Sequence, residues 1–278
     1  MISQFSKVRH QKRGFPLVTA RFPRVMAALA VTTIAGLCSL GAALPVNAAV
    51  VASYQFQNTL SSTIPTAPDL VPFALGTYTT VSIGGKPTTV YKFGKQGGLS
   101  LDTTGLISDN YTIATLFSFD DISGWRKILD LKNHTSDNAL YTLNGQLYYY
   151  SFASGGPAVS SGTFLEAVLT RDSSTNLITT YFDGNPVFSF TDATSDGVIS
   201  VANILNIFQD DNTTAGTESS SGSVAGIRIF NHVLTDAEVA NLDLITPVPG
   251  PLPLLGFAAA FGWSRSLRRR LRGSQATP

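Results

Sequence analysis

The middle of the chain consists of short runs rich in Val, Ile, Thr, Tyr and Phe, separated by Gly, Asn, Asp and Ser. Such runs are typical of β-strands joined by turns. Large side chains alternate along Tyr111–Phe119, as they do on a strand with two faces. Asn144-Gly145 and Asp183-Gly184 tolerate the positive φ angles of tight hairpins. The pattern predicts an all-β sandwich of two packed antiparallel sheets. The expected strands are Val50–Phe56, Val90–Phe93, Leu99–Asp102, Tyr111–Phe119, Lys127–Leu131, Leu140–Leu143, Gln146–Ser151, Phe164–Arg171, Leu177–Phe182, Val187–Thr191, Ile204–Phe208 and Ser223–Phe230.

A single segment, Leu234–Leu242, has helical character. Thr235 can cap a helix there, and Glu238 three residues later completes a capping box. Val239 and Leu242 supply one apolar stripe. We therefore expect one short helix that covers an end of the sandwich. Loops are expected at Ile64–Pro72 and Thr213–Ser223.

Charge is distributed unevenly along the sequence. Of its 19 Lys and Arg residues, six lie within residues 1–24 and five within 265–272, whereas all 18 Asp and Glu residues fall within 69–243. The central part thus carries eight basic and 18 acidic residues, a net charge of −10. A basic surface for nucleic acid is therefore not expected, and no nucleic-acid partner is predicted.

The sequence has one cysteine, Cys38, in an apolar run near the N-terminus. The central part therefore has neither a disulfide nor a thiolate ligand for zinc. Its stability must come from an apolar core, and about 195 residues are enough to form one.

The order of motifs in the central part resembles a laminin-G-like domain over about residues 50–243. The resemblance implies the concanavalin A-like jelly-roll sandwich, a fold shared by lectins, adhesion modules and glucanases, so it does not by itself select a function. The matching segments are Tyr111–Phe119 with Gly124–Asp130, Val168–Asp172 with Ile178–Gly184, and Gly222–Asn231 with Leu234–Val239.

Catalytic machinery is not visible in the sequence. Retaining glucanases of this fold need two carboxylates about 5 Å apart, supplied by a Glu-x-Asp-x-Glu strand or its one-residue-longer form. The sequence has only Glu166, Glu218 and Glu238, and none is paired in that way. His10, His134 and His232 are scattered and match no metal-binding spacing. We expect no enzyme and no catalytic residue, although Asp side chains brought together by folding remain an alternative.

Two acidic clusters are candidate calcium sites, because calcium prefers carboxylate and carbonyl oxygens on loops. Asp210, Asp211 and Asn212 form the first cluster, and Asp120 and Asp121 form the second. The same residue types are common in ordinary turns. Calcium is therefore a possible ligand of the domain and not a required cofactor.

Trp125, Tyr148 and Tyr150 are the candidate ligand-binding residues, because aromatic rings stack on sugars. Strand alternation puts Tyr148 and Tyr150 on one face and Tyr149 on the other. Packing within the sheet is the alternative role for all three candidates, since tyrosine is favoured in strands.

The N-terminal 48 residues have the pattern of a secretory signal. Basic residues precede an apolar run at Val25–Leu44, and Val46-Asn47-Ala48 presents small residues where signal peptidase reads them. Cleavage is expected after Ala48 or Ala49, with an uncleaved membrane anchor as the alternative.

The C-terminal residues 244–278 have three successive parts. Val248, Pro249, Gly250 and Pro251 precede a short apolar segment at about 252–263, and an arginine cluster follows it. This order resembles the PEP-CTERM signal handled by exosortases, with Gly250 in place of the Glu of that motif. The resemblance implies a transient anchor in the inner membrane and cleavage near Pro249–Pro251. Because the segment is shorter than the roughly 20 residues of a stable span, retention as a type I membrane protein is the alternative. The cluster that would stay in the cytoplasm is Arg265, Arg268, Arg269, Arg270 and Arg272.

Together these features predict an exported module at the cell surface or in the extracellular matrix. Signal peptidase and exosortase are its expected partners during export, and a glycan or another extracellular polymer is its expected ligand. A structural surface or adhesion protein without a glycan ligand is the first alternative, and a glycan hydrolase is the second.

Overall fold

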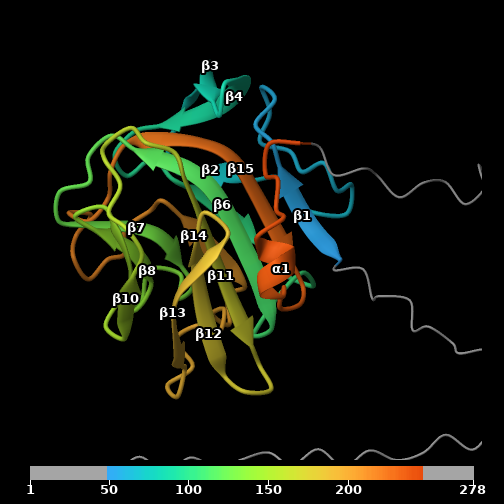
Figure 1. Cartoon of the computed structure of the whole chain (residues 1–278), viewed down its shortest axis with the longest axis vertical. Coiled ribbons are helices and arrows are strands. Elements are labelled where there is room, and N and C mark those ends of the chain that lie inside the picture. Colours follow the sequence, from blue (N-terminus) through green and yellow to red (C-terminus); the bar gives the residue numbers. More distant parts are fainter. Residues whose placement is uncertain (1–48, 247–278) are drawn as a thin grey trace, which may run out of the picture. The chain divides into compact units, whose positions relative to one another are not determined.

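The computed structural model describes residues 49–246, which form a sandwich of two antiparallel sheets (Figure 1). The strands of the eight-stranded sheet are β1 (Val50–Tyr54), β3 (Thr77–Ile83), β4 (Lys86–Phe93), β6 (Tyr111–Phe119), β11 (Leu165–Asp172), β12 (Leu177–Phe182), β13 (Asn185–Thr191) and β15 (Gly222–Phe230). Those of the seven-stranded sheet are β2 (Val71–Pro72), β5 (Leu99–Asp102), β7 (Trp125–Asp130), β8 (Leu140–Leu143), β9 (Gln146–Tyr149), β10 (Ala153–Gly155) and β14 (Ile204–Ile207).

The order of the strands shows that pairing between distant parts of the sequence closes the sandwich. The larger sheet runs β13-β12-β11-β6-β15-β4-β3, and β1 pairs with β15 beside β4. The smaller sheet runs β10-β9-β8-β7-β14-β5-β2. The last strand, β15, thus lies between strands from the first half of the chain. These crossovers confirm the predicted all-β jelly-roll sandwich.

Both predicted hairpin turns are present. Asn144 and Gly145 have φ angles of 49° and 84°, and Asp183 and Gly184 have φ angles of 44° and 77°. Two successive positive φ angles match the right-handed twist of the flanking strands. The turns fix the registers of β8 with β9 and of β12 with β13, and hence which side chains face outward.

The core lies between the two sheets and is rich in aromatic rings. Phe208 stacks on Phe93 with 4.7 Å between ring centroids and contacts Phe117 at 5.0 Å. These side chains are buried, as are the inward-facing residues of β5, β6 and β14. Burial of this apolar area stabilises a domain whose described residues contain no cysteine.

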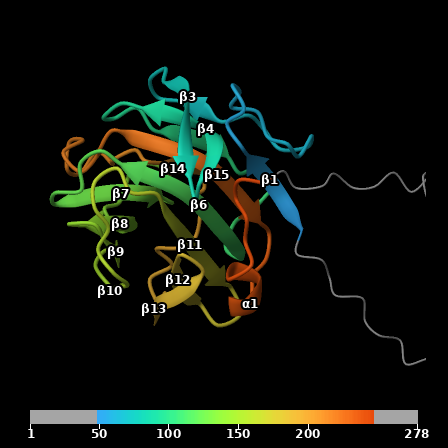
Figure 2. The same cartoon turned by 45° about the horizontal axis from the view of Figure 1, so that its top comes forward.

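The predicted helix is present but shorter than expected, at α1 (Asp236–Val239). The Thr235–Glu238 capping box forms as predicted. The helix ends early because the N–H groups of Asn241 and Leu242 bond to oxygens only three residues back. Figure 2 shows α1 against the larger sheet.

The position of α1 also differs from the prediction, because it does not cover an end of the sandwich. Val239 packs with Ala114, Val168 and Phe230, which alternate with core residues along β6, β11 and β15 and therefore point outward. The outer face of the eight-stranded sheet is thus partly covered by α1.

Three strands were not expected from the sequence: β2, β3 and β10. Strand β3 has no buried residue, and its polar Thr and Ser residues give no clear apolar alternation. Strand β2 occupies two residues of the predicted Ile64–Pro72 loop, at the edge of the smaller sheet. The other predicted loop is shorter than expected, because Gly222 and Ser223 already belong to β15.

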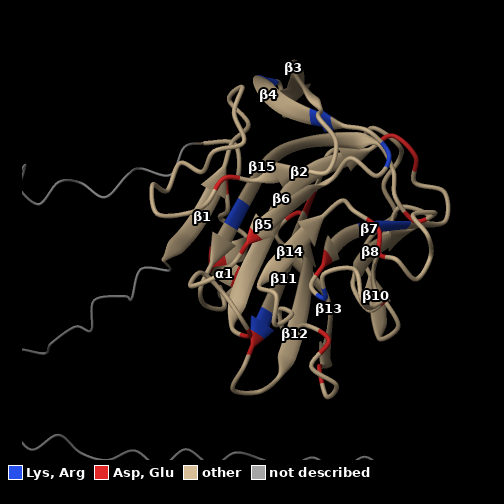
Figure 3. Cartoon of the chain, turned by 180° about the vertical axis from the view of Figure 1, so that it is seen from behind, with Lys and Arg blue, Asp and Glu red and all other residues tan. Residues whose placement is uncertain are grey.

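The predicted signal segment and sorting tail lie outside the described residues, apart from Ala49 and residues 244–246. Among residues 49–246 no helix is long and apolar enough to cross a membrane. Figure 3 shows acidic and basic segments scattered over this part of the chain, with no continuous basic face in that view.

Candidate functional site

The outer face of the seven-stranded sheet carries the candidate site, and strand register defines that face. Lys127 is paired with Tyr141, and Tyr141 with Tyr148, so these three side chains share one face. The neighbouring pair of Leu140 and Tyr149 faces the core. Lys127, Tyr141 and Tyr148 therefore point away from the core, and Tyr148 lies on the face opposite Tyr149, as alternation predicted.

Four aromatic side chains form a patch on this outer face. The Trp125 ring meets Tyr141, Tyr148 and Tyr150 edge to face, with centroid distances of 5.6, 4.9 and 5.4 Å. Trp125, Tyr148 and Tyr150 are partly exposed, whereas Tyr141 is buried. Folding thus brings together the three ligand-binding candidates chosen from the sequence. We call the four residues the aromatic patch.

A buried lysine lies beside the aromatic patch. Lys127 is fully buried, and its Nζ forms an ion pair with Asp211, lies 3.8 Å from Asp210 Oδ1 and lies 4.0 Å from Asp137 Oδ1. The same ammonium lies 4.8 Å from the centre of the Tyr141 ring. Burying an ammonium is costly unless carboxylates surround it, as they do here. We call Lys127, Asp137, Asp210 and Asp211 the lysine–aspartate cluster.

Glu218 extends this cluster toward the aromatic patch. Burial, with repulsion from Asp137 and Asp210, raises the pKa of Glu218 to about 7. Burial and a 2.7 Å hydrogen bond to Asp137 Oδ1 raise the pKa of the Tyr141 hydroxyl above its usual range. Glu218 can therefore hold a proton near neutral pH while its neighbour Asp137 accepts a hydrogen bond.

The geometry of the first calcium candidate favours the turn interpretation. The carboxylates of Asp210 and Asp211 are buried and accept bonds from protein donors, including the backbone N–H groups of Glu218 and Thr213 at 2.9 and 2.6 Å. Burial by itself would raise the pKa of Asp211. Hydrogen bonds from Lys127 and Thr213, with the charge of Lys127, outweigh burial and lower the pKa below its usual value. Asn212 is exposed beside them.

The second calcium candidate is also engaged in local bonds. Asp121 accepts a bond from Arg126 and one of 2.9 Å from the Ser123 backbone, and Asp120 Oδ2 accepts one of 2.7 Å from Ser221. Within residues 49–246 no group of three His, Cys, Asp or Glu side chains is placed to hold a metal ion.

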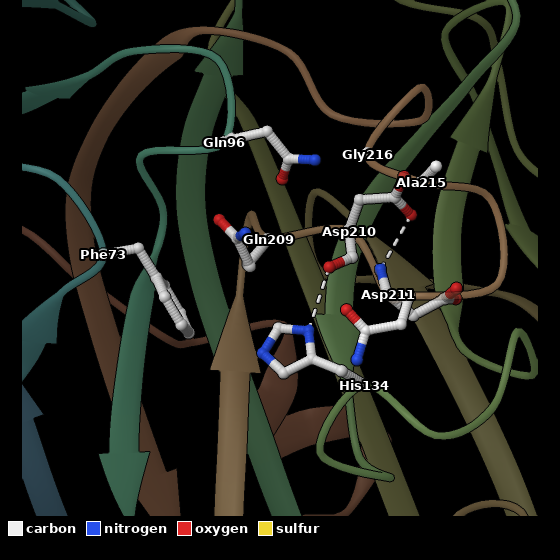
Figure 4. A pocket seen from close by; sticks show the side chains of 9 residues that line it. Phe73, Gln96, His134, Gln209, Asp210, Asp211, Ala215 and Gly216 are labelled. Carbon is white, nitrogen blue, oxygen red and sulfur yellow. Dashed lines mark hydrogen bonds between the residues drawn. The ribbon is translucent and has the colours of Figure 1, made fainter.

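Asp210 and Asp211 also line a pocket of about 550 Å³ (Figure 4). Phe73, Gln96, His134 and Gln209 surround the space in this view. The phenyl ring of Phe73 meets the imidazole of His134 at 5.4 Å, edge to face. His134 Nδ1 lies 2.9 Å from the Asp210 carbonyl oxygen, which ties the ring to the turn.

The remaining glutamates lie elsewhere. Glu166 is on β11 in the eight-stranded sheet, where its backbone N–H donates to Asp183 Oδ1 at 2.9 Å. Glu238 belongs to the α1 cap. Neither lies on the strands or the loop that form the candidate site.

A family model described as the concanavalin A-like lectin/glucanases superfamily, of laminin G type, matches residues 93–240. This match covers more than half of the chain and includes β5 to α1. The chain belongs to the concanavalin A-like lectin/glucanase superfamily. This confirms the resemblance of the central part to laminin-G-like domains. No curated protein matches the sequence.

Solved structures share the fold of this superfamily member at low sequence identity. Domain 4 of AbnA, a GH43 extracellular arabinanase from Geobacillus stearothermophilus solved with arabinotriose, has a TM-score of 0.54 at 15% identity, over 69% of this chain and 97% of that one. A structure of botulinum neurotoxin type C has a TM-score of 0.51 at 11% identity, over 69% of this chain and 50% of that one. The chain thus spans about half the length of the neurotoxin structure. Cell entry of that toxin is described as dependent upon interaction with two ganglioside molecules.

The sequence pointed to Asp210, Asp211 and Asn212 as calcium candidates, but not to their association with Lys127 and Asp137 or to the rest of the pocket. A usable signal was the charged Lys127 at the start of the predicted strand Lys127–Leu131, because a lysine inside a core strand needs a buried partner. Its partners Asp137 and Asp211 are 10 and 84 residues away in sequence, so only the fold identifies them. Phe73, Gln96 and Gln209 carried no such signal, because each lies in a connection between strands.

Proposed function

We propose that this superfamily member is an exported, non-catalytic module that binds carbohydrate or another extracellular polymer at the cell surface or in the matrix. The observation that carries the proposal is the convergence of Trp125, Tyr148 and Tyr150 on one outward sheet face. Partly exposed aromatic rings offer a sugar both apolar contact area and polar edges. On the eight-stranded sheet, by contrast, α1 covers part of the outer face.

Structures of the same fold support a binding role. The AbnA domain was solved with arabinotriose, and the neurotoxin type C structure is described by its interaction with gangliosides. These likenesses concern the fold, so the glycan of this chain has to be identified by experiment.

Hydrolysis is a second candidate, because Glu218 and Asp137 lie together on the same face. Glu218, with a pKa of about 7, could serve as an acid, and Asp137 could serve as its partner carboxylate. The bond from Tyr141 to Asp137 and the nearby Lys127 ammonium favour a structural role instead. If the chain is a hydrolase, it will release reducing sugar, and Glu218→Gln will abolish that release.

A glycan array probed with the purified full chain tests the binding proposal. We expect saturable binding to at least one neutral oligosaccharide, and we expect Trp125→Ala to weaken it at least about tenfold. Phe152→Ala is the matched control, because Phe152 is a partly exposed aromatic residue outside the patch. A chain that fractionates with the extracellular matrix and binds no glycan would instead be a structural surface protein.

Metal is not part of the proposed binding mode. We expect millimolar calcium to leave the melting curve and the glycan affinity unchanged, because protein donors already occupy Asp210 and Asp211. A calcium-dependent rise in melting temperature would assign these residues to a metal site.

The proposal also includes export by the two terminal segments. We expect mass spectrometry of surface material to find an N-terminus at residue 49 or 50 and a C-terminus near Pro249–Pro251. Recovery of surface material with an intact Arg272 would contradict cleavage by exosortase and support retention in the membrane.

A further inference from the structure

The pocket lined by the Asp210–Asp211 turn contains hydrogen-bond acceptors without donors. The Oε1 atoms of Gln96 and Gln209 are shielded from water, and no donor in the part of the chain that the structure describes reaches either oxygen. Both side chains line the pocket. Shielded acceptors without partners are rare, because each forfeits the bonds that it makes in water.

Gly216 leaves space for one of these amides. A Cβ atom at Gly216, which has a φ of +79°, would come within 1.5 Å of Gln96 Nε2. The glycine thus leaves the room that the Gln96 amide occupies. Because the terminal torsion of glutamine is soft, either amide oxygen can turn toward a bound group without movement of the backbone.

His134 adds a third acceptor in its uncharged form. Its Nδ1 lies 2.9 Å from the Asp210 carbonyl oxygen, and a carbonyl oxygen can only accept. Nδ1 must therefore carry the hydrogen, which leaves Nε2 of the neutral ring as an acceptor. In Figure 4 this second ring nitrogen points into the space between His134 and Phe73.

Phe73 supplies an apolar wall to the same pocket. Phe73 directly follows the edge strand β2, and its side chain is 45% exposed. Its ring meets the His134 ring edge to face. The pocket therefore combines one aromatic wall with three acceptors, and the aspartates at its base are bonded to protein donors. Such a lining is complementary to a neutral ring that carries several hydroxyl donors and an apolar face.

We infer that this pocket is a second carbohydrate subsite, which takes a neutral sugar unit of the same polymer whose other units contact the aromatic patch. Hydroxyl groups of the sugar donate to Gln96, Gln209 and His134, and the Phe73 ring contacts its C–H face. The inference rests on the proposed function and deepens it: the ligand is an uncharged oligosaccharide that spans both sides of the Asp210–Glu218 loop.

Isothermal titration of the full chain with arabinotriose, cellohexaose and maltohexaose tests the subsite. We expect Phe73→Ala and Gln209→Leu each to weaken the affinity for a bound oligosaccharide at least about tenfold. The matched controls are Leu75→Ala, since Leu75 is 93% exposed and does not line the pocket, and Gln57→Leu, an exposed glutamine elsewhere. Both controls should stay within about twofold of the parent. If Gln209→Leu does not fold, as judged by circular dichroism, Gln96→Leu takes its place.

The possible results separate the subsite from the proposed function. If Trp125→Ala weakens binding and the Phe73 and glutamine variants do not, the subsite is refuted and the proposed function stands. If the parent chain binds none of the three oligosaccharides and no glycan on the array, both are refuted. If calcium chloride raises the melting temperature of the parent and not of Gln209→Leu, the pocket is a cation site and the inference is wrong.

Discussion

Lys127 is the single residue that joins the two halves of the candidate site. Its ammonium lies between the Asp210–Asp211 turn, which forms one wall of the pocket, and the Tyr141 ring of the aromatic patch. The backbone N–H of Lys127 also donates to the Glu218 carbonyl oxygen at 2.9 Å. Both the side chain and the backbone of Lys127 therefore bind the Asp210–Glu218 loop to β7. Positioning of this loop therefore depends on a buried charge as well as on backbone pairing.

Replacement of Lys127 by Met should destabilise the protein by about 3–5 kcal/mol, because it leaves buried carboxylates without their cation. Urea unfolding of the full chain measures this change. Lys92→Met is the control, because Lys92 is exposed on β4 and should change the free energy of unfolding by less than about 0.5 kcal/mol. Equal effects of the two substitutions would show that the buried ion pairs do not hold the loop.

Two half-buried glutamates, Glu166 and Glu218, determine the expected pH dependence of stability. Burial, with repulsion from Asp183, raises the pKa of Glu166 to about 7, and the pKa of Glu218 is raised similarly, whereas an ordinary glutamate titrates near 4.5. Between these values the folded chain binds more protons than the unfolded chain. The stability that these groups contribute is thus fully present below about pH 4.5 and is lost as the pH rises through about 7.

We therefore expect the free energy of unfolding to fall from pH 5 to pH 8, by about 1 kcal/mol for each glutamate after allowance for solvent screening. Glu166→Gln and Glu218→Gln should each remove about half of this slope. Aspartates with lowered pKa values, such as Asp121, complete their titration below this range. A stability that rises between pH 5 and pH 8 would contradict these assignments.

At the scale of the elements, the Asn144–Gly145 turn does more than reverse the chain. A Cβ atom at Gly145 would lie 2.3 Å from the carbonyl oxygen of Val159, so the turn packs tightly against the segment before β11. Gly105 has a similar φ of +74°, but nothing lies within 4 Å of a Cβ built there. A side chain at either glycine would therefore be strained by the positive φ, but only at Gly145 would its Cβ also clash with neighbouring atoms.

Gly105→Ala should cost about 1 kcal/mol of stability, through the positive φ alone. Gly145→Ala should cost roughly 3 kcal/mol, because the backbone at Val159 must also move. Thermal or urea unfolding of the two variants measures the difference. Equal costs would indicate that the turn is not held against the Val159 segment.

Short-range patterns predicted most strands because they report local geometry. Strands β5, β6, β8 and β12 have the bounds expected from their apolar runs and turn dipeptides. Strand β3 was not predicted, because its side chains lie on an exposed hairpin, and neither were β2 and β10, which have only two and three residues. These three segments are strands because of the strands they pair with, and not because of the β-propensity of their own residues.

The site was predictable to the extent that it depends on strand alternation. Tyr148 and Tyr150 were expected on the face opposite Tyr149. The register places Tyr148 there, and ring contacts bring Tyr148 and Tyr150 to Trp125. The cluster around Lys127 and the pocket around Gln209 depend on loops from distant parts of the chain. Sequence spacing does not encode such contacts, so these residues were found only in the folded domain.

In the whole molecule the two sheets differ in what covers their outer faces. The eight-stranded sheet packs against α1, whereas the seven-stranded sheet presents the aromatic patch and the lysine–aspartate cluster. Two residues of that cluster, Asp210 and Asp211, also line the pocket. We propose that this second face is the glycan-binding surface of the module.

Hydrogen–deuterium exchange of the full chain, with and without the best oligosaccharide from the array, tests this claim most directly. We predict slower exchange in peptides from β7 to β9 and from the 209–218 loop, with no change in β3, β4 or α1. Protection confined to β3, β4 or α1 would contradict the assignment of the binding face.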